Sequence, residues 1–168
     1  LEKAQCYLRD TKHDAWIVYD FQSANPIAHF LLGHRPNATR RYFIIVPARG
    51  RPAVVASVID KFQFTSADFQ NVLSKNHHEL GKMLKHRVAD VKSAYLDYSP
   101  NCGIPHMSKI DLGTVEFLRS LNTSMIMDSS ADIFQYAMAT WSPLSLQKHL
   151  SASKLVEEIK TSAFNYIF

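Results

Sequence analysis

Eight histidines make metal binding the first chemistry to consider for this chain of 168 residues, because histidine is the commonest metal ligand in proteins. His78-Glu79 begins like the zinc-peptidase pattern His-Glu-x-x-His, but Lys82 stands where the second histidine would be. His86 lies two helical turns from His78, too far to share one ion without other ligands. The pattern therefore favours a solvated helical face over a zinc site.

Cys102 and His106 lie four residues apart, and a thiol at hydrogen-bond distance from an imidazole can act as a nucleophile. Catalytic pairs usually come from separate elements, so the alternative is a loop cysteine beside a surface histidine. The sequence has neither the Gly-x-Ser-x-Gly pattern of serine hydrolases nor a Gly-rich phosphate-binding loop.

Four aspartates stand where predicted strands end or a helix begins: Asp20, Asp60, Asp97 and Asp111. In an open α/β sheet, ligands bind in the crevice outside the carboxyl ends of the strands. Asp20 and Asp97 could therefore face one crevice and bind a cation or a substrate amine. Alternatively, such carboxylates cap helices and accept hydrogen bonds from loop N–H groups. We expect capping for Asp111, and both alternatives stay open for Asp20.

The elements that position these residues follow from apolar patterning and turn chemistry. Asn25-Pro26 starts a helix that ends at Gly33, because Asn caps helices and Pro fits their first turn. Ser74 and Asp111 are the expected caps of two later helices. We expect strands at 15–19, 42–46, 53–58, 71–73, 93–98 and 124–127, and helices at 1–12, 26–33, 74–86, 111–121, 131–138 and 142–168. Strands joined by helices, with one hairpin, predict an α/β fold with a mixed β-sheet flanked by helices on both faces.

Composition narrows the class of protein. The chain is 46% hydrophobic with a formal net charge of +4, which fits one folded domain and only a modest basic excess. The basic stretch from Arg35 to Arg51 is interrupted by a predicted strand, so we expect no nucleic-acid partner. Two cysteines form no disulfide framework, which favours the cytoplasm, and no apolar run is long enough to cross a membrane.

The last predicted helix differs from the others. It starts at Ser142-Pro143, and Leu155, Ile159, Ala163 and Ile167 carry its apolar stripe to the end of the chain. No stop signal follows that stripe. We therefore expect a piece of a longer protein, with a domain at 1–141 and, at 142–168, a helix that leads into an absent C-terminal domain.

Several segments, taken in order, resemble the N-terminal domain of creatinase/prolidase-type (pita-bread) metallopeptidases, in the bacterial subgroup of Xaa-Pro aminopeptidases and dipeptidases. The resemblance covers nearly all of the chain and implies a ribonuclease H-like fold. The segments are Trp16-Ile-Val-Tyr-Asp-Phe21, Asn25-Pro-Ile-Ala28 with Leu32-Gly33, Thr39-Arg-Arg-Tyr-Phe43 with Pro47-Ala-Arg-Gly50, Asp97 to Pro105, Asp111 to Val115, and Trp141-Ser-Pro143.

The resemblance implies a non-catalytic domain. Peptidases of this family bind two divalent ions (Mn, Co or Zn) through two Asp, one His and two Glu of a C-terminal catalytic domain, where the ions activate a bridging water. No part of this sequence matches that domain, so we assign this chain no catalytic residue, no metal ligand and no cofactor. The parent protein is then a hydrolase of short peptides.

The resemblance also implies partners: the protein's own catalytic domain and further copies of itself, in a homodimer or higher homo-oligomer. There the domain assists subunit assembly and narrows substrate access. Expected contacts with the substrate or the catalytic domain involve Asp20, Asn25, Arg40, Arg41 and Asn101. Either arginine could bind a substrate carboxylate or form a salt bridge to the catalytic domain. Two alternatives remain: a free-standing module that binds a small ligand or anion, and a hydrolase that uses Cys102 and His106.

Overall fold

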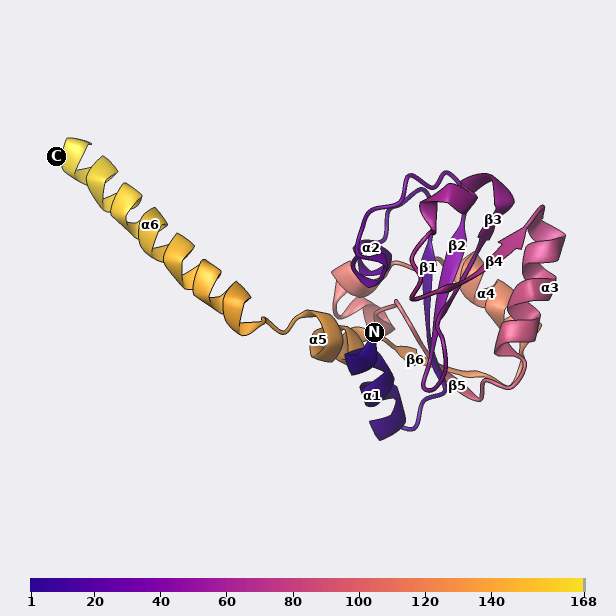
Figure 1. Cartoon of the computed structure of the whole chain (residues 1–168). Helices are drawn as coiled ribbons and strands as arrows, with labels where there is room; N and C mark the ends of the chain where they lie inside the picture. The colour runs from indigo at the N-terminus through magenta and orange to yellow at the C-terminus, as the bar shows by residue number, and fades with distance from the viewer. Residues whose placement is uncertain (168) are drawn as a thin grey trace. The chain divides into compact units, whose positions relative to one another are not determined.

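The computed structural model describes residues 1–167, which fall into two compact units, Leu1–Met138 and Ala139–Phe168. Within the described residues, the first unit holds a sheet of six strands in the order β4-β3-β2-β1-β5-β6 (Figure 1). The strands are β1 (Ala15–Asp20), β2 (Tyr42–Pro47), β3 (Ala53–Ser57), β4 (Gln70–Ser74), β5 (Ser93–Leu96) and β6 (Ile126–Ser129).

The sheet is mixed, as predicted. β2 runs antiparallel to its neighbours β1 and β3, and the other neighbouring pairs are parallel. The β2–β3 hairpin pairs Ile44 with Val54 and is the hairpin expected from the turn chemistry between Pro47 and Pro52. As a result, the carboxyl ends of five strands and the start of β2 lie along one edge of the sheet.

Helices cover both faces of the sheet, which confirms the predicted fold class (Figure 1). α1 (Glu2–Asp10), α2 (Pro26–Leu32) and α5 (Ala131–Met138) pack on one face, whereas α3 (His77–Val88) and α4 (Leu112–Leu121) pack on the other. Three short 3₁₀ helices, η1 (Val58–Gln63), η2 (Pro100–Cys102) and η3 (Pro105–Met107), lie in the connections at the carboxyl edge.

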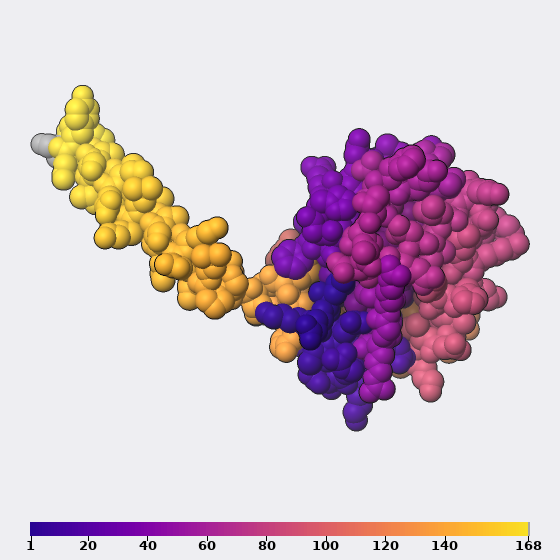
Figure 2. Space-filling model, viewed as in Figure 1, coloured from indigo at the N-terminus to yellow at the C-terminus, as the bar shows by residue number. Residues whose placement is uncertain are grey.

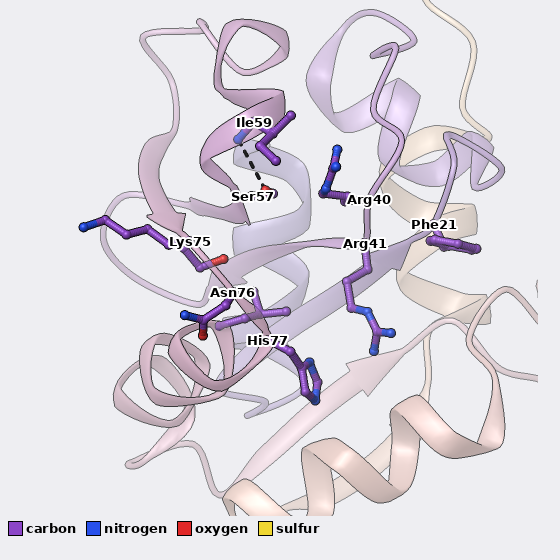
Figure 3. A pocket seen from close by; sticks show the side chains of 10 residues that line it. Phe21, Arg40, Arg41, Ser57, Ile59, Lys75, Asn76 and His77 are labelled. Carbon is purple, nitrogen blue, oxygen red and sulfur yellow. Dashed lines mark hydrogen bonds between the residues drawn. The ribbon is translucent and has the colours of Figure 1, made fainter.

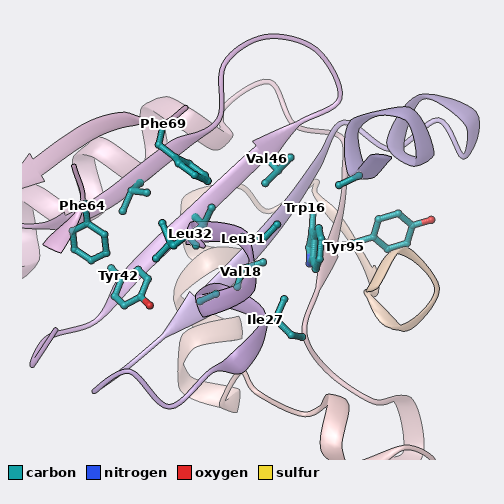
Figure 4. Close-up of a cluster of buried hydrophobic side chains, with 14 of the residues drawn as sticks. Trp16, Val18, Ile27, Leu31, Leu32, Tyr42, Val46, Phe64, Phe69 and Tyr95 are labelled. Carbon is teal, nitrogen blue, oxygen red and sulfur yellow. The ribbon is translucent and has the colours of Figure 1, made fainter. Parts of the chain in front are cut away.

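β1 is buried on both faces and feeds both hydrophobic cores. Trp16 and Val18 point into the core beneath α1, α2 and α5, shown in Figure 4. Ile17 and Tyr19 point into the core beneath α3 and α4. This two-residue alternation is that of a central strand, and it explains why the whole run from Ala15 to Tyr19 is apolar.

Several element boundaries differ from the sequence-based expectations; β5, for example, ends at Leu96 and not at residue 98. The cap of α3 is Asn76, which accepts a hydrogen bond from Glu79 N at 2.9 Å, not Ser74. Ser74 instead ends β4, and its hydroxyl bonds the carbonyl of Ala56 at 3.2 Å. β6 lies two residues further along the chain than predicted, because its register is set by pairing with β5. Val58 begins η1 and does not extend β3.

The second unit is dominated by α6 (Pro143–Ile167), which begins where Ser142-Pro143 predicted. The Ser142 hydroxyl accepts a hydrogen bond from Ser145 N at 3.1 Å. None of the described residues of α6 is buried, and the space-filling view shows side chains projecting along the whole helix (Figure 2). Among the described residues, no helix combines the length and apolar character needed to span a membrane.

Candidate functional site

The carboxyl edge of the sheet carries the site that the structure supports best. A cavity of about 300 Å³ opens there, lined by residues that follow β1, precede β2, end β3 and β4, and begin α3 (Figure 3). Crevices at this edge are where open α/β sheets bind ligands. The lining residues are Phe21, Arg40, Arg41, Ser57, Ile59, Ser74, Lys75, Asn76, His77 and Leu80.

Arg40 and Arg41 stand in the loop just before β2, and buried Asp60 holds the backbone of that loop. Its carboxylate accepts hydrogen bonds from Thr39 N at 3.4 Å and Arg40 N at 3.3 Å. The Arg40 guanidinium donates to Thr39 Oγ1 at 2.9 Å. Figure 3 shows the Arg41 guanidinium and the His77 imidazole on the same side of the cavity, with the Lys75 ammonium directed away from them.

Arg41 also lies near Asp111, the cap of α4. The Asp111 carboxylate accepts a hydrogen bond from Thr114 N at 2.9 Å, as its predicted capping role requires, and another from Thr114 Oγ1 at 2.7 Å. The bond from the Thr114 hydroxyl lowers the pKa of Asp111, and the positive charge of Arg41 acts in the same direction. The guanidinium therefore sits in a negative potential without forming an ion pair at contact distance within the described residues.

Asp20 and Asn25 lie inside the fold and not on its surface, with 1% and 2% of their area exposed. Asp20 accepts hydrogen bonds from Ala24 N at 2.8 Å and Asn25 N at 3.3 Å. Of the two alternatives for Asp20, these contacts match that of a carboxylate satisfying loop N–H groups. Any role of Asp20 or Asn25 in substrate access or domain contact stays a prediction.

The second oxygen of Asp20 meets two further side chains. Tyr42 donates its hydroxyl to Asp20 Oδ2 at 2.5 Å, and His29 Nε2 lies 3.6 Å from the same oxygen. Burial, followed by the hydrogen bond and charge of Asp20, raises the pKa of Tyr42, so the phenol is a neutral donor. His29 Nε2 is buried without a hydrogen-bond partner, and the nearby carboxylate partly offsets the cost of that burial.

Asp97, directly after β5, is fully buried and accepts three side-chain hydrogen bonds. The donors are Ser130 Oγ at 2.7 Å, Trp16 Nε1 at 2.9 Å and Asn25 Nδ2 at 3.0 Å. Burial raises the pKa of the Asp97 carboxyl, although these three hydrogen bonds and the charge of Lys109 act in the opposite direction. Asp97 therefore ties β1, α2 and the start of α5 together and does not open into the cavity.

Asn101, Cys102 and His106 lie on the exposed loop formed by η2 and η3. Asn101 and Cys102 both adopt positive φ, at 52° and 56°. No hydrogen bond joins Cys102 to His106 among the residues that the structure describes, so nothing in its geometry activates the thiol. None of these three residues lines the cavity that contains Arg40 and Arg41. Asn101 is therefore not part of the same candidate site as the two arginines.

The described residues show no cluster of metal-binding side chains. Within residues 1–167, no three His, Cys, Asp or Glu side chains come together in a way that could hold an ion. His78 and His86 are exposed on α3, as a solvated face predicts. The described residues therefore do not fit a two-metal centre, and no metal-dependent step is assigned to them.

Arg40 and Arg41 are the predicted site residues that line the cavity; the other eight lining residues, among them Phe21, Lys75 and His77, were not predicted. Phe21 follows β1 directly, and His77 is the first residue of α3. Position at a strand end or a helix start was therefore the available signal. That signal does not by itself tell which strand-end and helix-start residues line one cavity.

Several solved structures of known proteins have a similar fold. No model of a protein family matches the sequence, and no curated protein sequence matches it. Among solved structures, prolidase from Pyrococcus horikoshii matches 98% of this chain with 14% identity and a TM-score of 0.61. Prolidase from Thermococcus sibiricus matches 95% of it with 12% identity and a TM-score of 0.66.

The share of the other chain that is matched differs between whole enzymes and isolated domains. This chain spans 42% of the Pyrococcus horikoshii prolidase chain and 41% of the Thermococcus sibiricus chain. It spans 92% of the creatinase/prolidase N-terminal domain of an X-Pro dipeptidase from Streptococcus pyogenes, with 13% identity, 78% of this chain matched and a TM-score of 0.56. The first unit therefore has the creatinase/prolidase N-terminal fold that the sequence segments predicted.

Proposed function

We propose that this chain is the non-catalytic N-terminal domain of a metal-dependent Xaa-Pro aminopeptidase or dipeptidase. One observation carries the proposal: the chain matches nearly the whole of an isolated N-terminal dipeptidase domain but less than half of complete prolidase chains. The catalytic centre, with its two divalent ions, would then belong to a following domain. The described residues offer no metal cluster of their own that competes with this assignment.

The expected roles of the domain are subunit assembly and control of substrate access, in an oligomeric cytoplasmic enzyme. The carboxyl edge of the sheet is the surface suited to these roles, because it combines exposed apolar side chains with unpaired positive charge. Phe21 and Ile59 are 46% and 61% exposed and line the same cavity as Arg40 and Arg41. Aromatic side chains and arginine are enriched at protein interfaces.

α6 supports a following domain of the same protein. Leu155, Val156 and Ile159 are each more than half exposed, on a helix with no buried residue among those described. Burying such a stripe against a partner is worth about 25 cal/mol per Å² of apolar surface. The 1–141 domain and the 142–168 helix then form the start of the parent protein and its connection to the catalytic domain.

The alternative function is a free-standing module that binds a small ligand or an anion, favoured by the cationic cavity. The coding sequence after residue 168 separates the two. The proposal expects the reading frame to continue into a region with two Asp, one His and two Glu ligands. A stop codon directly after Phe168 would favour the free-standing module.

A further inference from the structure

The cavity at the carboxyl edge has a lining with unbalanced charge. Arg40, Arg41, Lys75 and His77 line it, and no acidic side chain does. None of these four side chains forms an ion pair within the part of the chain that the structure describes. Arginine is a strong binder of oxyanions, because its guanidinium presents paired N–H donors to two oxygens.

The acids nearest to these arginines are already engaged. Asp60 is buried and accepts the backbone N–H groups of Thr39 and Arg40. Asp111 accepts both hydrogen bonds that Thr114 offers. The negative charges of these two aspartates partly compensate the positive charges of the arginines. The N–H donors of Arg41 nevertheless stay available to a ligand in the cavity. Arg40 keeps most of its donors as well, since within the described residues its side chain donates one hydrogen bond, to Thr39.

The remaining lining is apolar. Phe21 and Ile59 are 46% and 61% exposed, and Leu80 closes the side formed by α3. A volume of about 300 Å³ is at the lower end of the range for small-molecule sites. A bare inorganic anion would leave this apolar surface unused, whereas a small organic acid with an apolar body would cover it.

We propose that this cavity binds a small organic carboxylate, with its head group on Arg41, whose guanidinium lies on the same side of the cavity as His77 (Figure 3), and its apolar body against the apolar side chains of the lining. The site belongs to the first unit alone. It does not depend on whether a catalytic domain follows, so its failure in a binding test leaves the proposed function untouched.

The test is a titration of the 168-residue chain, followed by two-dimensional NMR, with 3-phenylpropionate, its neutral analogue 3-phenylpropanamide, and inorganic phosphate. We expect 3-phenylpropionate to shift the amide signals of Phe21, Arg41 and His77, and to bind more tightly than the other two. Arg41→Gln should weaken it by roughly 10-fold or more, the usual effect of losing one charge-assisted hydrogen bond.

Arg49→Gln is the matched control, because Arg49 is exposed in the turn after β2, at the opposite edge of the sheet. It removes the same charge and should leave the affinity within about twofold. Equal loss in both variants would show a nonspecific charge effect and overturn the proposal. Tighter binding of phosphate, equal binding of the amide, or no saturable shift with any of the three compounds would overturn it as well.

Discussion

The side chain of Asn25 donates a hydrogen bond to Asp97 across 72 residues of sequence, with Nδ2 3.0 Å from Oδ2. The same amide nitrogen donates to the carbonyl of Tyr19 at 2.8 Å, and the amide oxygen accepts from Ile27 N at 3.0 Å. Asn25 thus caps α2, holds the end of β1 and supplies a donor to a buried carboxylate. The contact joins the neighbouring parallel strands β1 and β5 at the carboxyl edge of the sheet, where the candidate site also lies.

Replacing Asn25 by alanine should destabilise the first unit by about 2–4 kcal/mol. Loss of a helix cap costs about 1 kcal/mol, and leaving buried Asp97 without one donor adds about 1–3 kcal/mol. The free energy of unfolding measured in urea checks this. Asn37→Ala is the control, since Asn37 is exposed; its effect should stay within about 0.5 kcal/mol. Equal stability of the two variants would contradict the structural role of Asn25.

The buried carboxyl of Asp97 predicts a particular pH dependence. Burial raises its pKa in the folded state above the ordinary value of 3.8, so the folded chain binds this proton more tightly than the unfolded chain does. Its contribution to stability is therefore fully present below pH 3.8 and is lost as pH rises through the folded-state pKa.

Asp97→Asn cannot titrate and isolates this effect. The stability of the wild-type chain minus that of the variant should decrease as pH rises above 3.8, with a slope of at most about 1.4 kcal/mol per pH unit. Urea unfolding of both proteins at a series of pH values measures the difference. A difference that stays constant or grows with rising pH would show that the hydrogen bonds to Asp97 outweigh its burial.

The layer formed by α3 and α4 can be tested with a pair of leucines. Leu84 is fully buried in the core beneath these helices, whereas Leu112, on α4, is 71% exposed. Leu84→Ala should lower the free energy of unfolding by about 2–5 kcal/mol, because it leaves a cavity. Leu112→Ala removes the same atoms from the surface and should cost less than about 0.5 kcal/mol. Similar values for the two would contradict this arrangement of layers.

The apolar stripe of α6 can be tested in a longer protein. Changing Leu155 and Ile159 together to glutamine removes two apolar side chains that are 57% and 60% exposed. The double variant should lower the urea midpoint of a longer protein in which a following domain covers the helix. An unchanged midpoint of that longer protein would contradict the burial of α6 against a following domain.

Local signals in the sequence predicted the order of the elements well. The apolar run of β1, the Asn25-Pro26 helix start, Gly33 as the helix end and Asp111 as a cap are all present in the structure. Each of these features depends on residues that are close together in the sequence, so the sequence alone is enough to predict it. The mixed sheet followed from the hairpin and the helical connections.

Contacts between distant residues could not be predicted in this way. Trp16, Ser130 and Asn25 meet at Asp97 only because β1 lies beside β5. The apolar run predicts that β1 is buried. It does not predict which side chains donate hydrogen bonds to the buried carboxylate of Asp97. The shift of β6 has the same origin, since pairing with β5 and not local preference decides its register. Arg40 and Arg41 were predicted as site residues, but the cavity that groups them with His77 exists only in the folded sheet.

Hydrolysis of an Xaa-Pro dipeptide such as Ala-Pro in the presence of Mn²⁺ tests the central claim most directly. The 168-residue chain should be compared with the full product of its reading frame, at equal molar concentration. The account predicts turnover by the full product and none by the 168-residue chain, because the described residues bring no metal-binding cluster together. Turnover by the 168-residue chain alone, lost in Cys102→Ala, would contradict the account and favour a hydrolase built on the Cys102–His106 loop.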